Sequence, residues 1–278
     1  MKRFVTTTLA GALIAGFAWA AAPAADAHAS ADVKWYGQAA FRIKTPGGKV
    51  IVIDPFITKN PKTPADDKDL AKLGKVDLIL VTHGHGDHIG DTAALAKMTG
   101  AKVGVNADMG HTMRILGMVP KEQLIRFNKS GPITPLGPDI TITMTHAEHS
   151  SEIVSKKDGV EAIYPGGEPA GYIIKLEDGY TIYHSGDTGV FKDMELIHDL
   201  YKPDLALICI GGWFTMDPRH AAYAVNKFLK PKTVMPMHYG TFGLLKGTPD
   251  QLKTHLSGMG DTTEIVVMQP GDEKTFGK

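Results

Sequence analysis

The stretch Val81-Thr82-His83-Gly84-His85-Gly86-Asp87-His88-Ile89-Gly90-Asp91 decides how the rest of this chain is interpreted. It follows residues 76–80, an apolar run typical of a buried strand, and Asp91 predicts the N-cap of a helix over 91–99 that ends at Gly100. Five side chains with an imidazole or a carboxylate lie within nine residues. The cluster is therefore predicted on a strand-to-helix loop, where α/β proteins place ligands and catalytic groups.

Four other apolar runs also end in polar groups followed by a turn. The polar groups are Asp54-Pro55, residues 145–150 with His146 and His149, residues 184–189 with His184 and Asp187, and His238-Tyr239-Gly240-Thr241. If these strands share one sheet edge, their imidazoles and carboxylates converge there. Convergence at one edge is the strongest prediction that spacing alone offers.

This set of ligand groups predicts a metal site. Histidine and aspartate without cysteine suit zinc first, with manganese or iron as alternatives. His83 and His85 lie two residues apart, so a bent loop can direct both to one ion, and Asp87 and His88 then point to a second position. A carboxylate can bridge two ions, which makes Asp187 the natural bridge. Two divalent ions would hold a hydroxide at neutral pH and polarise the bond that it attacks.

Other polar residues have plainer interpretations. His111, His198 and His255 fall in helical stretches and are expected on the surface or in the core, and His146 at a strand end or behind a ligand. Asp54 is either a turn former or a carboxylate that supports a metal-bound histidine. His220, in the first turn of a helix, is an alternative site residue. Cys209, in an apolar strand, is expected to be a core thiol.

Composition fits a soluble globular protein and gives no sign of a polyanionic partner. The 278 residues are 43% hydrophobic and 22% charged, with 30 basic and 30 acidic side chains. We expect no nucleic-acid partner and a small-molecule substrate; the oligomeric state stays open. A single cysteine excludes an internal disulfide framework.

Residues 1–29 are predicted to be a signal peptide and residues 30–278 a hydrolase domain. Lys2 and Arg3 precede an apolar run over about 9–22, and cleavage signals of small residues end at Ala20 and at Ala29. The run is shorter than the ~20 residues that span a bilayer, although an uncleaved anchor is the alternative. The layout predicts a periplasmic or secreted protein without a stable membrane anchor after cleavage.

The remaining pattern predicts hairpins first and alternating helices and strands later. We expect strands over 33–43, 50–54, 102–106, 170–176, 180–185, 205–210, 233–237 and 264–268, helices over 67–73, 107–116, 191–200 and 218–229 and from Pro249, short strands within 124–145, and an irregular loop over 147–168. Such an order predicts an α/β (α+β) fold with two mixed sheets packed together and covered by helices.

The motif His83-x-His85-x-Asp87-His88 resembles the HxHxDH signature of the metallo-β-lactamase-fold hydrolases. The resemblance continues through Asp54, His149, Asp187 and His238, and it covers residues 33–270. It implies a four-layer αββα sandwich. It also implies one ion on His83, His85 and His149, another on Asp87, His88 and His238, and Asp187 between them.

Further stretches are similar to the uncharacterised metal-dependent hydrolases related to bacterial ascorbate-phosphate lactonases. These are residues 167–172, 183–189, 214–218 and 236–241. Aspartate rather than cysteine at position 187 argues against antibiotic hydrolysis as the main activity, and His85 in place of glutamate argues against flavodiiron redox chemistry. The export signal argues against an intracellular phosphorylated metabolite as the substrate.

The sequence therefore predicts a dinuclear-metal hydrolase that cleaves a lactone, ester, amide or phosphodiester bond. Asp87 is expected to orient the nucleophile, Asp187 to join the ions, and His184 or Tyr239 to return a proton. A catalytically inactive metal-binding protein and a mononuclear iron oxygenase are the alternatives. Loops 147–168, 211–217 and 239–247 are expected to build the pocket, with Trp213 shaping it.

Overall fold

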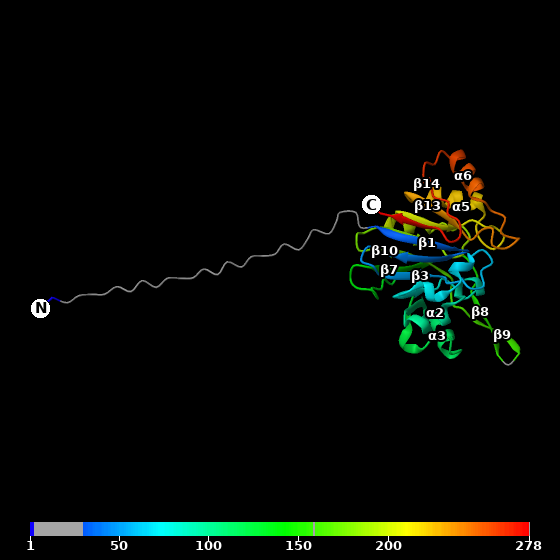
Figure 1. The fold of residues 1–278 in the computed structure, drawn as a ribbon. Helices are drawn as coiled ribbons and strands as arrows, with labels where there is room; N and C mark the ends of the chain where they lie inside the picture. Colours follow the sequence, from blue (N-terminus) through cyan, green and yellow to red (C-terminus); the bar gives the residue numbers. More distant parts are fainter. Residues whose placement is uncertain (3–29, 158, 278) are drawn as a thin grey trace.

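The computed structural model describes residues 1–2, 30–157 and 159–277 (Figure 1). The predicted signal peptide therefore lies, apart from Met1 and Lys2, outside the described residues. Within the described ranges, no helix combines the length and apolar character needed to cross a bilayer.

Two mixed sheets form the centre of the molecule. The first has the strand order β15 (Glu273–Phe276), β1 (Ala31–Gly37), β2 (Ala40–Lys44), β3 (Val50–Ile53), β4 (Leu78–Leu80), β5 (Lys102–Asn106) and β6 (Leu124–Phe127). The second has the order β14 (Glu264–Ile265), β13 (Thr233–Met237), β12 (Leu205–Cys209), β11 (Thr181–His184), β10 (Ala170–Lys175) and β7 (Thr141–His146). In each sheet an antiparallel part is continued by parallel strands.

Helices cover the two outer faces, which gives the four layers that the sequence predicted (Figure 1). The helices are α1 (Gly86–Ile89), α2 (Thr92–Thr99), α3 (Ala107–Ile115), α4 (Met194–Tyr201), α5 (Pro218–Ala224), continued by a π-helical turn (Val225–Leu229), and α6 (Pro249–Gly258). Short 3₁₀ turns occupy Ala65–Asp67, Leu70–Leu73 and Lys121–Gln123. In Figure 1, α2 and α3 lie on the side of β3, and α5 and α6 lie beside β13 and β14.

Alternating side chains of the central strands fill two separate apolar layers. Ile51 and Ile53 of β3 pack between the sheets, in the same cluster as Tyr172, whereas Val50 and Val52 face α2 and α3. This division follows from the two-residue period of a strand with both faces buried. Cys209 belongs to the same apolar cluster as Ile51, Ile53 and Tyr172 and is a buried free thiol, as predicted.

Three local predictions were wrong. The single strand expected over 33–43 is divided by a tight turn at Gln38-Ala39 into β1 and β2, with Gln38 in the left-handed region at φ 52°. The loop expected over 147–168 contains a hairpin of β8 (Glu152–Lys157) and β9 (Val160–Pro165). The closing strand β15, which pairs with β1, was not expected at all.

Asp91 begins α2 as predicted, but its side chain does not cap that helix. The carboxylate instead accepts hydrogen bonds from the backbone N–H groups of Ile57 (2.9 Å) and Thr58 (2.8 Å) and from the Thr58 hydroxyl (2.6 Å). Gly90 completes this contact, because a Cβ there would lie 2.5 Å from the carbonyl oxygen of Pro55. The His-rich loop and segment 55–58 are therefore fixed to each other.

Candidate metal centre

All seven predicted ligands come together where strands of both sheets end. His83 and His85 follow β4, the one-turn helix α1 contributes Asp87 and His88, and the second sheet contributes the remaining three from the ends of β7, β11 and β13, namely His149, Asp187 and His238. Gly84 is required in the loop, since a Cβ there would meet the backbone oxygen of Glu152 at 2.6 Å. The predicted convergence of strand ends is confirmed, but the strands belong to two sheets and not to one.

Three groups of side chains lie close enough to hold an ion. The histidine set is His83, His85 and His149; the carboxylate set is Asp87, His88 and His238; and Asp187 groups with His83 and His88 between them, the candidate ligand atoms of each group lying within 4.8 Å of one another. One oxygen of Asp187 lies 2.9 Å from His238 Nε2, 3.2 Å from His88 Nε2 and 3.7 Å from His149 Nε2. Asp187 therefore contacts members of both sets.

Asp54 supports the cluster from behind, which resolves the alternative left by the sequence. Its carboxylate lies 2.7 Å from His88 Nδ1 and accepts hydrogen bonds from the Thr82 hydroxyl (2.7 Å) and the Thr82 backbone N–H (2.8 Å). The Thr82 oxygen also lies 3.0 Å from His83 Nδ1. These contacts hold the Nδ1 atoms of both histidines and leave their Nε2 atoms directed into the cluster.

Gln38 is a site residue that the sequence did not predict. Its side-chain amide nitrogen donates to Asp87 Oδ2 at 2.8 Å and lies 2.7 Å from His238 Nε2. Its backbone carbonyl oxygen accepts a hydrogen bond from the His238 backbone N–H at 3.0 Å. Gln38, Asp54 and His238 all have positive φ values, 52°, 45° and 56°. Strained non-glycine backbone is typical of functional sites, but the sequence carries no local signal for it beyond Gly37.

The two sets differ in their proton affinities. Burial lowers the pKa of His83 well below its usual value and also lowers the pKa of His85 and of His149. Burial acts in the same direction on His88 and His238, but neighbouring carboxylates outweigh it, raising the pKa of His88 well above its usual value and that of His238 to about 9.

The two carboxylates stay ionised. Burial alone would raise the pKa of Asp87 and of Asp187, but the charges and hydrogen bonds of His88 and His238 outweigh burial and hold both pKa values below the usual range. The carboxylate set is thus a network of opposite charges, whereas the histidine set is neutral.

The donor atoms fit divalent metal ions. The buried atom Asp187 Oδ1 has no hydrogen-bond partner within the described part of the chain. His83 Nε2 and His85 Nδ1 face each other at 2.9 Å, an arrangement that a shared cation stabilises. Nitrogen and carboxylate donors without sulfur are ligands for zinc, manganese or iron.

His184 does not reach this cluster. It is fully buried, its Nε2 lies 3.0 Å from the carbonyl oxygen of Ala39, and its Nδ1 accepts from the Gly186 backbone N–H at 3.1 Å. With both ring nitrogens engaged, His184 braces the turn before Asp187, and its predicted role as a proton donor is wrong. His220 is also outside the site, bonded to Asp217 at 2.8 Å on the exposed start of α5.

A pocket of about 750 Å³ opens at the metal centre. Five of the seven predicted ligands line it, and its other lining residues include Phe56 and Lys59 as well as Ser150, Phe214, Phe242 and Leu245 from the predicted loops. Trp213 is absent from the lining and is 75% exposed, so it lies outside the pocket that it was expected to shape.

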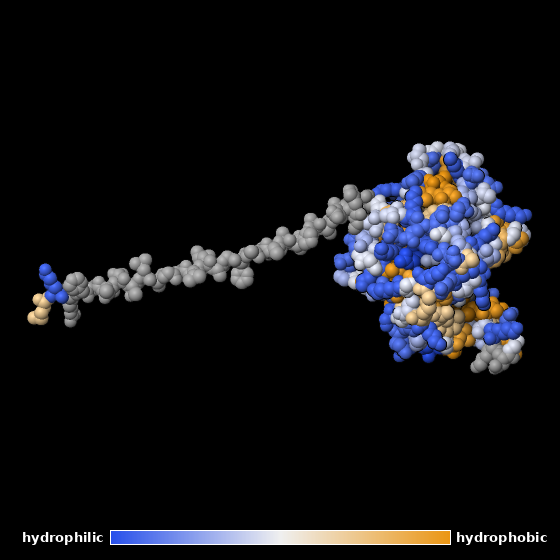
Figure 2. Space-filling view, in the orientation of Figure 1, coloured by the Kyte–Doolittle hydropathy of each residue, from blue (hydrophilic) through white to orange (hydrophobic). Residues whose placement is uncertain are grey.

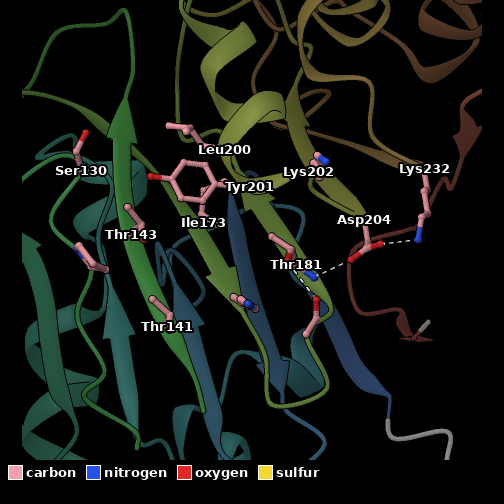
Figure 3. Close-up of a pocket in the computed structure, with 13 residues that line it drawn as sticks. Ser130, Thr141, Thr143, Ile173, Thr181, Leu200, Tyr201, Lys202, Asp204 and Lys232 are labelled. Atoms are coloured by element: carbon pink, nitrogen blue, oxygen red, sulfur yellow. Dashed lines mark hydrogen bonds and ion pairs between the residues drawn. The ribbon is translucent and has the colours of Figure 1, made fainter. Parts of the chain in front are cut away.

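A second cavity of similar size, about 760 Å³, lies on the outer face of the second sheet (Figure 3). Threonines of two strands line it, Thr141 and Thr143 of β7 and Thr181 of β11. Asp204, the one acidic group among its described lining residues, is engaged by Lys232 at 2.7 Å and by the Thr181 backbone N–H at 2.9 Å. The described lining residues of this cavity belong to none of the three groups of candidate metal ligands.

Fold and site together define the class of protein. Residues 49–239 match the family described as the beta-lactamase superfamily domain. The chain is 53% identical over 249 residues to a UPF0173 metal-dependent hydrolase of Cupriavidus necator, covering 88% of this chain and 86% of the relative. The chain therefore belongs to the metallo-β-lactamase superfamily and, within it, to the UPF0173 metal-dependent hydrolases.

Solved structures agree with this assignment. The metallo hydrolase Igni18 of Ignicoccus hospitalis is 35% identical with a TM-score of 0.76, over 90% of this chain and 99% of that one. The metallo-β-lactamase fold protein YhfI of Bacillus subtilis, at 15% identity, shares the fold with a TM-score of 0.63, over 89% of this chain and 99% of that one.

Proposed function

We propose that this metal-dependent hydrolase uses two divalent ions to cleave a lactone, ester, amide or phosphodiester bond. The observation that carries the proposal is the position of Asp187 between the histidine set and the carboxylate set at the end of an open pocket. Two ions bound there would lower the pKa of a water molecule and polarise the bond under attack. Zinc is the proposed metal, with manganese or iron as alternatives.

The chain's own groups would orient the reactants. Asp87 is ionised, lines the pocket and is held by the Gln38 amide, so it can accept a hydrogen bond from water and direct its lone pair to the substrate. Asp54 would keep His88 in the correct tautomer. Aromatic side chains of the pocket would exclude bulk water from the ligands.

Metal removal and reconstitution test this proposal. Chelator-treated mature protein is loaded with zinc, manganese or iron and assayed on a lactone, a p-nitrophenyl ester, bis-p-nitrophenyl phosphate and a β-lactam. We expect two ions per chain and hydrolysis only after loading. His85→Ala should abolish hydrolysis, whereas His255→Ala, a histidine of α6 outside the cluster, should keep both ions and full activity. Hydrolysis by metal-stripped protein would contradict the proposal.

We also propose that the protein is exported. The support is sequence alone: Lys2 and Arg3, the apolar run and the small-residue cleavage signals of residues 1–29. N-terminal sequencing of periplasmic and secreted fractions should find a chain that begins at Ala21 or Ser30. A full-length chain in the cytoplasm would rule this out.

A further inference from the structure

The pocket at the metal centre is lined by two kinds of side chain. Five of the seven predicted ligands line it, and its apolar lining consists of Phe56, Phe214, Phe242 and Leu245. The rings of Phe56 and Phe242 lie 6.4 Å apart, although they come from opposite halves of the chain. A molecule whose reacting bond lies at the ligands must therefore place its remaining atoms against aromatic and aliphatic side chains.

Apolar side chains of the two loops that line the pocket are also exposed at the surface. Trp213 and Phe214 are 75% and 56% exposed, and Phe242 and Leu244 are 43% and 44% exposed. Most of the face in Figure 2 is hydrophilic, and hydrophobic surface is confined to separate areas, one of them at the right-hand edge where Figure 1 draws the loops in orange. Exposed apolar residues gathered beside a pocket mark a binding surface. We call these four residues the rim.

The loops that carry the rim are braced at their bases. The Gly247 N–H donates to the carbonyl oxygen of Gly211 at 3.1 Å, which joins loop 211–217 to loop 239–247. A side chain at Gly247 would collide with the carbonyl oxygen of Ile210, so the close approach requires glycine. Trp213 has φ 64°, a left-handed conformation that is rare for a bulky residue. A strained, exposed tryptophan on a braced loop points to a function for its position.

Apart from the ligands, the pocket offers few groups that could recognise an anion. Lys59 is the one lysine or arginine among the described residues that line the pocket, and it is exposed. Sites that recognise phosphoryl groups usually direct several Arg or Lys donors at the anion. Phe56, Phe214, Phe242 and Leu245 instead offer apolar contact.

We propose that the substrate is a carboxylic ester or lactone of an apolar acid. Its acyl chain or aryl group contacts Phe214 and Phe242 inside the pocket and extends toward the other two rim residues, Trp213 and Leu244. This inference rests on the proposed hydrolase function and narrows it to one substrate class. In the reaction, the oxygen of water forms a bond to the acyl carbon and the acyl carbon–oxygen bond breaks. One proton of the water ends on the released alcohol, and the products are a carboxylic acid and an alcohol, or a hydroxy acid from a lactone.

A chain-length series tests the proposal on the metal-loaded mature protein. With p-nitrophenyl acetate, butyrate and octanoate, kcat/KM should rise by about fourfold for each methylene that is buried, equivalent to about 0.8 kcal/mol, so that burial of only two methylenes gives about sixteenfold between acetate and octanoate. Phe214→Ala and Phe242→Ala should each reduce the octanoate-to-acetate ratio by about tenfold. Leu200→Ala, which removes a 68% exposed apolar side chain at the second cavity, is the matched control and should leave the ratio unchanged.

Binding to metal-free protein supplies a readout that does not depend on activity. Calorimetric titration should detect saturable binding of octanoate, weaker binding of acetate, and a loss of the difference in Phe214→Ala. A ratio near one across the ester series, or equal binding of both acids, would overturn the substrate class and leave the hydrolase proposal standing. Cleavage of bis-p-nitrophenyl phosphate without cleavage of any carboxylic ester would also overturn the substrate class and leave the hydrolase proposal standing. If the two-ion protein hydrolyses nothing in the panel, both proposals are wrong.

Discussion

The histidine set and the carboxylate set lie side by side but are built differently. His85 and His149 of the histidine set are partly exposed and line the pocket. In the carboxylate set, His88 and His238 are almost completely buried and are surrounded by Asp54, Asp87 and Asp187. The comparison shows that one edge of a sandwich can hold a neutral, accessible set and a charged, enclosed set that share only Asp187.

This difference predicts that the two sets bind metal ions in different ways. An accessible neutral set can bind an ion without displacing protons, whereas the enclosed set must give up the protons that its carboxylates stabilise. Four experiments can distinguish the two sets, and they are ordered from the largest expected effect to the smallest.

Removing the shared group should have the largest effect. In Asp187→Ala we expect no measurable hydrolysis and at most one bound ion per chain. The metal-free variant should also lose about 3 kcal/mol of unfolding free energy, because His88 and His238 lose a buried partner. Elemental analysis and urea unfolding measure these effects, with Asp187→Asn as the control that preserves side-chain volume. Two ions retained in Asp187→Ala would show that the sets are independent.

Breaking one set at a time should separate metal binding from stability. His85→Ala and His238→Ala should each keep one ion and lose hydrolysis. Thermal unfolding should differ. Loss of the partly exposed His85 should change the unfolding free energy by no more than about 0.5 kcal/mol, whereas loss of the buried His238 removes a cationic partner from Asp87 and Asp187 and should cost about 3 kcal/mol. Equal destabilisation by the two variants would argue against the comparison.

Removing the support behind the carboxylate set should weaken only that set. Asp54→Asn changes the group that holds His88 Nδ1, and outer partners of this kind contribute about 10–100-fold in metal affinity. Competition with a chelator should show one weakened site and one unchanged site. Loss of affinity at both sites would mean that Asp54 acts through the Thr82 contact to His83 as well.

The smallest expected effect is a difference in proton release. At pH 7 the raised pKa values of His88 and of His238, about 9 for the latter, keep both imidazoles protonated in the metal-free protein. The lowered pKa values of His83, His85 and His149 keep these three neutral. Metal binding by the carboxylate set should therefore release about two protons, and the metal affinity of this set should increase as pH rises from 7 to 9. Metal binding by the histidine set should release no protons. Calorimetry in buffers of different ionisation enthalpy counts the protons, and equal release from both sets would contradict the assignment.

Sequence reasoning succeeded where the determining contacts are local. The prediction for α6 rests on Thr248 and Gln251, whose side chain and backbone bond each other reciprocally in the structure. Strand β5 matches its predicted bounds because its apolar run lies between Gly100 and a helix that Asn106 caps. The cluster of ligands was predictable because each ligand follows a recognisable apolar strand, although these strands belong to two sheets.

The missed features depend on distant residues or on a signal that was overlooked. The pairing of β15 with β1 joins Phe276 to Ala31, which no local pattern reveals. Gln38 reaches Asp87 across 49 positions and His238 across 200. The β8–β9 hairpin, in contrast, had a visible signal, since Asp158-Gly159 between alternating residues is a strong turn sequence.

The side chain of Asp91 has a consequence for how this pocket can change over evolutionary time. Because Asp91 fastens residues 57 and 58 to the loop that carries His83 and His85, a substitution that shifts Phe56 also shifts the chemistry. The walls at 211–217 and 239–247 are joined to each other, and no backbone hydrogen bond among the described residues connects them to the loop 83–91. New specificities should therefore arise, in nature or in directed evolution, by changes in those two loops, while segment 54–58 stays constant.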